Sequence, residues 1–383
     1  MDNSPLQNLL LKEYLEAGSM AKFYGFSPFK PPTLKKEDYD LTKNFNSSYH
    51  PEEKSAILRT YFEEKMYSVQ PSMLWTTRPF PGSTERKHPH RLDCMFVTLG
   101  STKSVCECLC IQAGVALLDS MGHKALEVRL NSVGDKESIA DFERKYLYYI
   151  RKNIASFPSD LRQAIKKNPF VLVSNRNDNW KSFRDAAPKS IEFLSEPSRL
   201  HFKEVLEFLE VMNIPYSIDD SLQGDPDISS ETIFSIFSND TKEELATGMR
   251  SNRMARKIGA KKEAPIVTLN ISVKLKKPMK EIRDRGHKPR FYLVQFGPEA
   301  KLKSFLILEE LRKAGTHVVH SLAKDKLGSQ IGVAENMNVP FILLVGQREA
   351  LDNCVVVRNT LTRAQEIVPI RELSAKIKLF QDK

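Results

Sequence analysis

The spacing of apolar residues predicts helices and short strands in the first half of the chain. Apolar side chains recur every three or four positions on a buried helix face and every second position on a buried strand face. Helical spacing occurs at residues 6–25, 56–66, 104–121, 136–168 and 198–212. Runs rich in β-branched and aromatic residues predict strands at 73–77, 94–99 and 125–130.

The pattern changes in the second half, at a segment that reads as a linker. Residues 233–237 and 266–273 resemble strands, and the basic stretch 242–258 between them has helical character. Residues 278–289 combine Pro, Gly and charges with little apolar content. Beyond them the pattern predicts strands at 291–296, 317–321 and 341–345, helices at 300–314, 326–337 and 370–381, and a hairpin from 355–358 and 366–369. This alternation predicts a mixed, mainly parallel sheet of four to five strands covered by helices.

Composition narrows the class of protein. Of 383 residues, 41% are hydrophobic and 28% are charged, and no apolar run reaches the roughly 18–20 residues that span a bilayer. The start of the chain lacks the form of a signal peptide. We therefore expect a soluble, cytoplasmic protein without a membrane partner.

Three of the five cysteines form the pattern Cys106-x-Cys108-x-Cys110. Thiolates are good zinc ligands, so a structural metal is one interpretation. On the helix expected at 104–121, however, Cys106 and Cys110 share a face and Cys108 does not. With no second cysteine or histidine pair to complete a tetrahedral site, we expect buried helix cysteines and no metal site.

The net charge of +10 is localised. Residues 241–290 hold fifteen Lys and Arg against five Asp and Glu, which equals the excess of the whole chain. Concentrated positive charge suits a polyanion, because neutralised phosphates release their counterions. A solvated charged face or a flexible linker explains the charge equally well.

The C-terminal 95 residues resemble the anticodon-binding domain of the histidyl-tRNA synthetases, a class II family. The similar segments occur in the family's order and spacing. They are residues 294–300 (Val-Gln-Phe-Gly-Pro-Glu-Ala), 308–315 (Leu-Glu-Glu-Leu-Arg-Lys-Ala-Gly), 327–331 (Leu-Gly-Ser-Gln-Ile), 340–346 (Pro-Phe-Ile-Leu-Leu-Val-Gly) and Val368-Pro369. The resemblance continues upstream at residues 24–26, 58–62, 130–138, 185–189 and 214–216, and so covers nearly the whole chain.

This resemblance implies an α+β core with an antiparallel sheet, a helical insertion and a C-terminal α/β anticodon-binding domain. We expect the core at 1–280 with the insertion at about 136–212, a linker at 281–290 and the C-terminal domain at 291–383. The family also implies a homodimer, since class II scaffolds generally pair through the helix-to-strand junction that Tyr24-Gly25-Phe26 resembles.

The residues that the family uses for chemistry depart from its pattern here. Aminoacyl adenylate formation needs arginines around the reacting phosphate. The stretch that resembles motif 2 is Arg78-Pro79-Phe80-Pro81, without the glutamate of the family's Arg-x-Glu. In the stretch that resembles motif 3, Val273 stands where the second arginine belongs, and Lys274 follows it.

The segments that resemble the histidine-specific motifs also differ. Gly224 replaces a catalytic arginine, and Asp227 is retained beside it. Arg250 is retained in the stretch that resembles Gly-Gly-Gly-Arg-Tyr-Asp, but Met249 stands at a position where glycine allows close approach of the backbone to a ligand. We interpret Arg78, Gly224, Asp227, Arg250 and Val273 as a vestigial pocket and expect no catalytic residue.

Basic residues remain in two places where the resemblance implies RNA contact. The first is the loop of motif 2, which carries Arg86, Lys87, His88, His90 and Arg91. The second is the region that begins the helix at 326–337, with Lys324, Lys326 and Gln330. Such groups suit phosphates and unstacked bases.

These observations predict a synthetase-like protein that binds tRNA or another structured RNA without efficient aminoacylation. One alternative is an active histidine–tRNA ligase, which would use ATP and Mg²⁺. A second is a regulatory paralogue that binds a protein partner. The fold does not decide among them.

Overall fold

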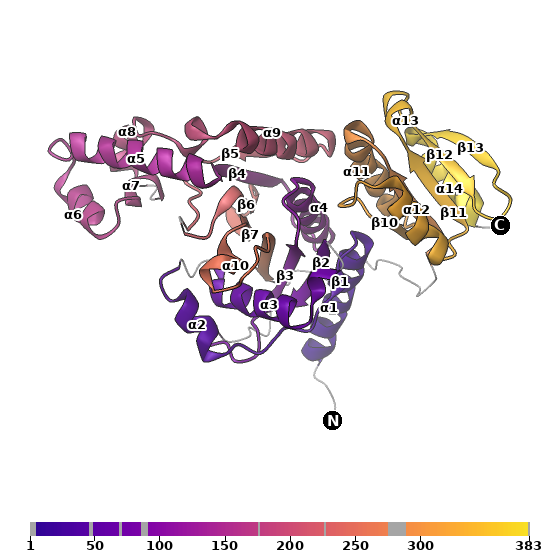
Figure 1. The fold of residues 1–383 in the computed structure, drawn as a ribbon, viewed down its shortest axis with the longest axis horizontal. Helices are drawn as coiled ribbons and strands as arrows, with labels where there is room; N and C mark the ends of the chain where they lie inside the picture. Colours follow the sequence, from indigo (N-terminus) through magenta and orange to yellow (C-terminus); the bar gives the residue numbers. More distant parts are fainter. Residues whose placement is uncertain are drawn as a thin grey trace.

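The computed structural model describes residues 5–45, 49–68, 71–85, 91–174, 177–225, 227–274 and 289–381. Two sheets organise these residues, one of eight strands and one of five. In Figure 1 the larger sheet lies near the centre, with a group of helices extending to one side and the smaller sheet on the other. The linker expected at 281–290 lies outside the described residues except for Pro289 and Arg290.

The larger sheet has the strand order β1-β2-β3-β8-β7-β6-β4-β5. In chain order its strands are β1 (Ser27–Pro28), β2 (Ser72–Thr77), β3 (Arg91–Leu99), β4 (Leu126–Gly134), β5 (Tyr216–Ile218), β6 (Ser230–Ser238), β7 (Glu243–Ser251) and β8 (Ile266–Lys274). The six inner strands pair antiparallel, and the outermost two, β1 and β5, pair parallel with their neighbours. The antiparallel core that we expected is therefore confirmed.

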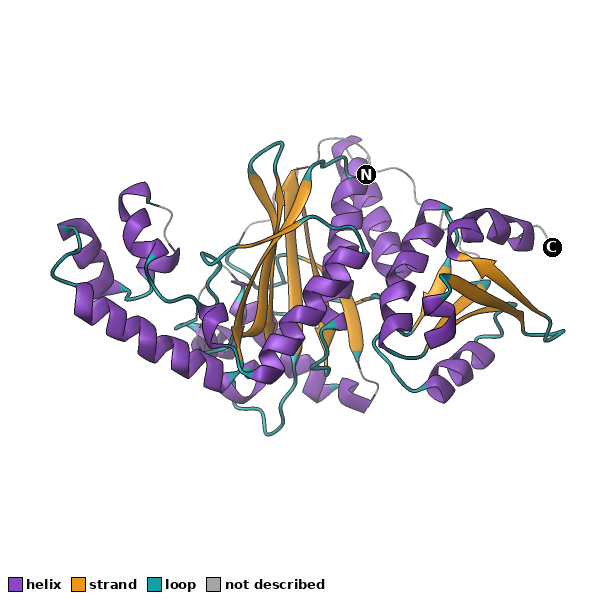
Figure 2. Cartoon of the chain, turned by 90° about the horizontal axis from the view of Figure 1, so that it is seen from above, coloured by secondary structure: helices purple, strands orange, loops and turns teal. Residues whose placement is uncertain are grey.

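Helices cover both faces of this sheet (Figure 2). The first face packs against α1 (Pro5–Phe23), α4 (Val105–Ser120) and α9 (Glu196–Val211), and the second against α3 (Pro51–Glu63) and α10 (Met254–Lys257), with α2 (Lys36–Thr42) beside α3. Successive side chains of a strand point to opposite faces. Phe96 of β3 is thus buried with α4, whereas Met95 is buried with α3. Among the helices in the described part of the chain, none is long and apolar enough to cross a membrane.

The helical insertion follows β4 and has a small core of its own. It contains α5 (Lys136–Asn153), α6 (Ser159–Lys167), α7 (Val171–Ser174), η3 (Asp178–Trp180), α8 (Lys181–Asp185) and η4 (Ser190–Phe193). Tyr146, Leu161 and Trp180 are buried together in that core. The single helical run expected at 136–168 is wrong, because the chain breaks between α5 and α6. Pro158 directly precedes α6, where its missing N–H costs no helical hydrogen bond.

The structure also corrects the prediction for residues 242–258. We expected a helix, but most of it is β7 and only α10 is helical. The charges of this stretch suggested a helix, whereas pairing with β6 and β8 on both sides determines the structure. At Gly248 an added Cβ would lie 2.4 Å from the ring of Phe234, so the cross-strand packing requires a glycine there.

The C-terminal region forms the five-stranded sheet, in the order β10-β9-β11-β12-β13. Its elements are β9 (Phe291–Gln295), α11 (Pro298–Lys313), β10 (Val318–His320), α12 (Leu327–Asn336), β11 (Phe341–Val345), α13 (Gln347–Leu351), β12 (Cys354–Asn359), β13 (Gln365–Pro369), η5 (Ile370–Glu372) and α14 (Leu373–Gln381). Strand β9 pairs parallel with β10 and β11, and β12 pairs antiparallel with β11 and β13. The expected alternation and hairpin are present, but half of the pairings are antiparallel, so the sheet is not mainly parallel.

The C-terminal region packs against the helices on the first face of the larger sheet. The rings of Phe208 on α9 and Phe305 on α11 lie 4.9 Å apart between centroids. Gln112 of α4 donates from Nε2 to the backbone oxygen of Phe305 at 3.2 Å, and Tyr24 donates from its hydroxyl to Glu309 at 3.2 Å. The two sheets are therefore joined through one continuous apolar core.

Candidate functional site

Arg78 lies directly after β2 and is buried in an ion pair. Its Nε contacts Oε2 of Glu53 on α3, and its Nη2 lies 3.4 Å from Oε2 of Glu85. The other oxygen of Glu53 accepts a hydrogen bond from the backbone N–H of Phe80 at 3.1 Å. Arg78 is 4% exposed and Glu53 is completely buried. Acidic groups of the protein itself therefore hold this guanidinium.

Two more basic side chains are buried next to Arg78. Burial and the charge of Arg78 lower the pKa of His50 to about 3, and its Nδ1 lies 3.3 Å from Oε1 of Glu85. The Nζ atom of Lys54 lies 5.5 Å from the centroid of the Tyr49 ring. Burial lowers the pKa of Lys54 to about 7, although the charge of Asp225 opposes the shift. At neutral pH His50 is therefore uncharged and Lys54 carries only part of a positive charge.

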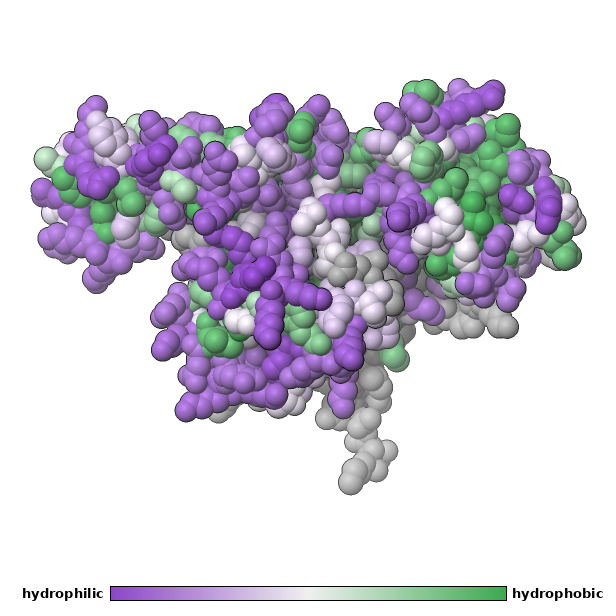
Figure 3. Space-filling model, in the orientation of Figure 1, coloured by the Kyte–Doolittle hydropathy of each residue, from purple (hydrophilic) through white to green (hydrophobic). Residues whose placement is uncertain are grey.

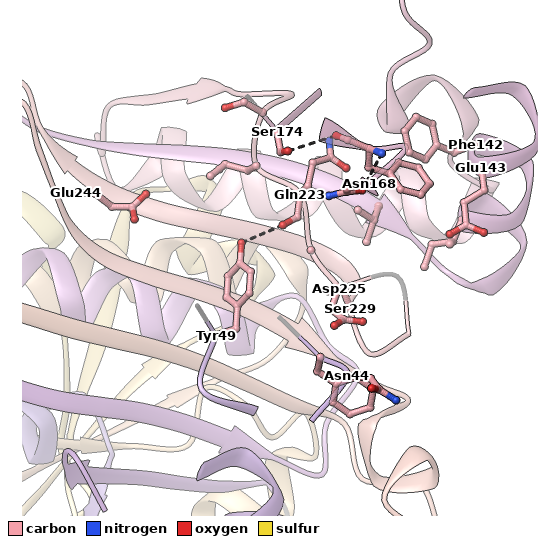
Figure 4. Close-up of a pocket in the computed structure, with 17 residues that line it drawn as sticks. Asn44, Tyr49, Phe142, Glu143, Asn168, Ser174, Gln223, Asp225, Ser229 and Glu244 are labelled. Atoms are coloured by element: carbon pink, nitrogen blue, oxygen red, sulfur yellow. Dashed lines mark hydrogen bonds between the residues drawn. The ribbon is translucent and has the colours of Figure 1, made fainter. Parts of the chain in front are cut away.

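A cavity of about 790 Å³ opens between this region and the helical insertion. Its walls come from the loop before α3, from α5 and the segment up to α7, from residues 221–229 and from the start of β7. The hydroxyl of Tyr49 donates to the backbone oxygen of Gln223 at 3.2 Å on one wall. In the view of Figure 4, Glu244 and Glu143 lie on opposite sides of the cavity, and Asp225 lies close to Ser229.

Gly224 is part of this cavity wall, at the position where the resemblance implies an arginine. A Cβ added at Gly224 would lie 2.1 Å from Oγ of Ser229 and 2.6 Å from Cδ1 of Ile233. A larger side chain thus requires the wall to rearrange. Asp227 is exposed, does not line the cavity and pairs with Lys257 of α10.

Arg250 lies on the other face of the sheet, which corrects its expected place beside the pocket. It is completely buried against α4, where Nε and Nη2 contact both carboxylate oxygens of Glu107. Its Nη1 donates to the backbone oxygen of Ser101 at 2.8 Å, and its Nη2 to that of Lys103 at 2.7 Å. The guanidinium therefore joins β7 to α4 and has no access to the cavity.

Val273 also faces the core under α4, where it is 2% exposed. The position that the resemblance assigns to a phosphate-binding arginine thus points away from Arg78 and from the cavity. The vestigial pocket that we expected is consequently divided: Gly224 lines the cavity, Arg78 lies near it, Asp227 lies at the surface, and Arg250 and Val273 lie behind the sheet.

Of the residues expected to contact RNA at positions 86–91, the structure describes Arg91 alone. Arg86, Lys87, His88 and His90 lie outside the described residues. Arg91 is partly exposed, and its Nη2 donates at 2.8 Å to both the backbone oxygen and the Oγ of Ser272. Arg91 is thus partly engaged within the protein.

In the C-terminal region, Lys326 is exposed at the start of α12 and Lys324 is partly buried. Gln330 is completely buried, which corrects its expected place at an RNA-facing surface. Its Oε1 accepts from the backbone N–H of Gln295 at 3.1 Å, and its Nε2 donates to the backbone oxygen of Gln295 at 2.9 Å. These bonds fasten α12 to β9.

Exposed cations gather on and after α10. Arg256, Lys257, Lys261 and Lys262 are exposed there, and Lys262 lies 5.2 Å from the centroid of the Tyr67 ring. Only Glu263 and Asp227 among the described residues pair with this set. Hydrophilic residues cover this region in Figure 3. These four exposed cations belong to the basic stretch 241–290 and are called the α10 basic surface below.

Cys106, Cys108 and Cys110 are all buried within α4. Burial raises the pKa of the Cys108 and Cys110 thiols well above the usual range, which favours the neutral thiol. Within the described ranges, no group of three or more His, Cys, Asp or Glu side chains is arranged to hold a metal ion.

Comparisons with known proteins identify the scaffold. Residues 295–379 match the family model described as an anticodon binding domain. The histidine–tRNA ligase of Thermosynechococcus vestitus is 26% identical over 337 residues, which cover 84% of this chain and 77% of the relative. That of Bacillus velezensis is 25% identical over 370 residues, with 91% and 85% covered. The apo histidyl-tRNA synthetase structure from S. aureus has a TM-score of 0.55 at 20% identity, over 98% of this chain and 97% of that one. This chain is thus similar to the class II histidyl-tRNA synthetases in sequence over most of its length and in fold over nearly all of it.

These similarities confirm both the resemblance and the fold class that it implied. The five-stranded C-terminal sheet carries the segment that matches the anticodon-binding model. The histidyl-tRNA synthetase fold also extends to a Bacillus halodurans structure named as an ATP phosphoribosyltransferase regulatory subunit/histidyl-tRNA synthetase, with a TM-score of 0.50 at 14% identity over 90% of this chain and 96% of that one. Similarity of sequence and fold alone assigns no catalytic role to a residue of this chain.

Sequence reasoning missed the acidic partners that decide the state of the two arginines. Glu53 lies 25 residues before Arg78, and Glu107 lies 143 residues before Arg250. It also missed Tyr49, Lys54 and Asp225, which meet beside the cavity from segments far apart in the sequence. The one signal in the sequence was the charged run Glu52-Glu53-Lys54 directly before the apolar residues 56–58 of α3.

Proposed function

We propose that this chain binds tRNA or another structured RNA and does not efficiently charge tRNA with histidine. The observation that carries the proposal is the state of its two retained arginines. The Arg78 guanidinium is buried against Glu53 and Glu85, and that of Arg250 is buried against Glu107 and two backbone oxygens. All three guanidinium nitrogens of Arg250, and two of the three of Arg78, thus already contact groups of the protein, which opposes their binding a reacting phosphate as well.

The cavity supports the same conclusion, because its walls do not fit a triphosphate. Its described lining contains Glu143, Asp225 and Glu244 but no Lys, Arg or His. The ammonium of Lys54 lies beside the lining residue Tyr49, is buried and is only partly charged at neutral pH. A polyanion placed in this cavity would lose hydration and gain like-charge repulsion. ATP and Mg²⁺ therefore have no part in the proposed function.

The RNA part of the proposal rests on the C-terminal region and on the α10 basic surface. The sequence of residues 295–379 matches an anticodon-binding model, and Lys326 is exposed at the start of α12. Four cations are exposed on and after α10. Phosphate contacts from such a surface supply affinity without sequence specificity, and exposed bases supply specificity.

ATP–pyrophosphate exchange with histidine tests the absence of charging directly. The histidine–tRNA ligase of Bacillus velezensis serves as the positive control, assayed at the same protein concentration. We expect no exchange above background from this chain, together with a salt-dependent shift of tRNA in a gel. Histidine-dependent exchange at a rate near that of the control would overturn the proposal. Failure to shift any tRNA at low salt would remove its RNA part.

The leading alternative is an active histidine–tRNA ligase, which the names of the relatives favour. The exchange assay separates it from the proposal. A regulatory paralogue that binds a protein partner is a further alternative, suggested by the regulatory-subunit name of the Bacillus halodurans structure. That role predicts neither exchange nor RNA binding.

We also propose that the chain forms a homodimer, as class II scaffolds generally do. Light scattering at micromolar concentration tests this. A mass near the 43.8 kDa of one chain contradicts it, and twice that mass supports it.

A further inference from the structure

The 790 Å³ cavity has walls whose chemistry differs from that of a nucleotide site. Three carboxylates line it at separate places: Glu143 on α5, Asp225 in the loop before β6 and Glu244 at the start of β7. In the view of Figure 4 the two glutamates lie on opposite sides. None of the described lining residues is basic. Lys54 acts on Asp225 and Arg253 acts on Glu143 from just behind the walls, but the three carboxylates outnumber these two cations, so the described lining favours a positively charged ligand.

Aromatic rings and one unused hydroxyl complete the walls. Phe45, Tyr49, Phe142 and Phe170 all line the cavity, and ring faces attract organic cations. Ser229 lines it as well, is 1% exposed, and its Oγ has no hydrogen-bond partner among the described residues. A buried polar atom without a partner is costly, so such an atom facing a cavity indicates a missing hydrogen-bonding group.

We propose that this cavity binds an extended organic polycation of the polyamine class. Ammonium groups separated by methylene chains match carboxylates at separate positions, and the methylenes match the rings between them. A volume of about 790 Å³ falls within the range of small-molecule sites. This proposal goes beyond the proposed function and does not depend on RNA binding.

Isothermal titration of the nuclease-treated full chain with spermidine tests the proposal at about 150 mM salt, where exposed charges are largely screened. We expect one saturable site for spermidine and none for ATP. Glu143→Gln and Glu244→Gln should each weaken binding by about fivefold to tenfold, because each removes one charge-assisted contact. Glu299→Gln, an exposed change at the start of α11, serves as the matched control and should leave the affinity unchanged.

The two glutamates are better targets than Asp225, because Asp225 also holds its own loop. Its Oδ1 accepts a hydrogen bond from the backbone N–H of Asp227 at 2.9 Å. Its backbone oxygen accepts one from the backbone N–H of Ser229 at 2.8 Å. No saturable heat with spermidine would overturn the proposal. Binding that is equally strong in both glutamate variants, or binding of ATP displaced by spermidine, would also overturn it. None of these results bears on the pyrophosphate exchange assay. Failure of the polyamine proposal can therefore be distinguished from failure of the proposed function.

Discussion

Arg250 and Glu107 form a two-point ion pair that joins β7 to α4, with neither side chain exposed to solvent. Nε2 of His201 lies 2.8 Å from Oε1 of the same glutamate. A charge buried in such a pair is costly once its partner is removed, because the remaining charge stays out of water. Removal of either partner alone should therefore destabilise the fold, at a position that the resemblance assigned to chemistry.

Replacing this arginine should destabilise the fold strongly. Arg250→Leu should lower the free energy of unfolding by about 3–5 kcal/mol, since Glu107 is left buried and uncompensated. Urea unfolding followed by circular dichroism measures the change. Arg256→Leu, at an exposed arginine 4.0 Å from Glu263, is the matched control and should cost under about 0.5 kcal/mol. Equal effects from the two substitutions would show that the buried pair of Arg250 and Glu107 does not stabilise the fold.

Acid should weaken the same pair. Burial would raise the pKa of Glu107, but the charges of Arg250 and His201 outweigh it and lower the pKa from 4.5 to about 2. Because the folded-state pKa is depressed, the stabilisation is complete above about pH 4.5 and is lost as the pH falls toward 2. Its size is about 3 kcal/mol, from the shift of the pKa. Unfolding measured from pH 5 to pH 2.5 should show this slope, and Glu107→Gln should reduce it.

His320 predicts a second pH effect, in a higher range. Burial lowers its pKa to about 4, and its Cε1 would lie 3.2 Å from a Cβ added at Gly25. The unfolded chain takes up a proton below about pH 6.5 that the folded chain takes up only near pH 4, so stability falls as the pH drops through that window. His320→Gln should reduce the slope of stability against pH between pH 6.5 and 4. Part of the slope should remain, because the pKa of His50 is also lowered in the folded chain. An unchanged slope in His320→Gln would contradict the assignment.

The sequence predicted most helices and strands correctly wherever an apolar period was long and a turn residue marked its end. The helix at 104–121 and the strand at 341–345 agree closely with α4 and β11, because each buries nearly all of its apolar positions. The helix predicted for residues 242–258 was wrong because long-range pairing in the sheet outweighed the local preference of these residues. The candidate site was harder still. Whether Arg78 faces a phosphate or a glutamate depends on α3, and no local pattern reports contacts between distant segments.

The contact between Phe208 and Phe305 affects how the RNA experiments should be designed. Deleting residues 291–383 would expose the apolar surface of α4 and α9 that α11 covers, so the truncated chain should aggregate. Phe305→Ala should instead loosen the packing of the C-terminal region and cost about 3–5 kcal/mol, as truncation of a buried aromatic generally does. Thermal unfolding and limited proteolysis near residues 281–290 measure the effect. Unchanged cleavage there, with unchanged stability, would show that this contact does not hold the two sheets together.

Removing exposed cations should distinguish phosphate contacts from base recognition. Arg256→Gln, Lys261→Gln and Lys262→Gln together should weaken binding of all tRNAs alike and flatten the dependence of affinity on salt by about one unit per lost phosphate contact, or somewhat less. Arg86→Ala with Lys87→Ala tests the basic residues that precede β3 in the sequence in the same way. Arg91 is the poorer target, because it also donates to Ser272.

Lys326→Ala should instead reduce the preference for a histidine tRNA over other tRNAs, since α12 belongs to the anticodon-binding segment. Fluorescence anisotropy with labelled tRNAs at several salt concentrations measures both quantities, with Lys313→Ala on α11 as the control. If Lys326→Ala changes only the salt slope and the α10 variant changes the preference among tRNAs, the assignment of specificity to the C-terminal domain is reversed.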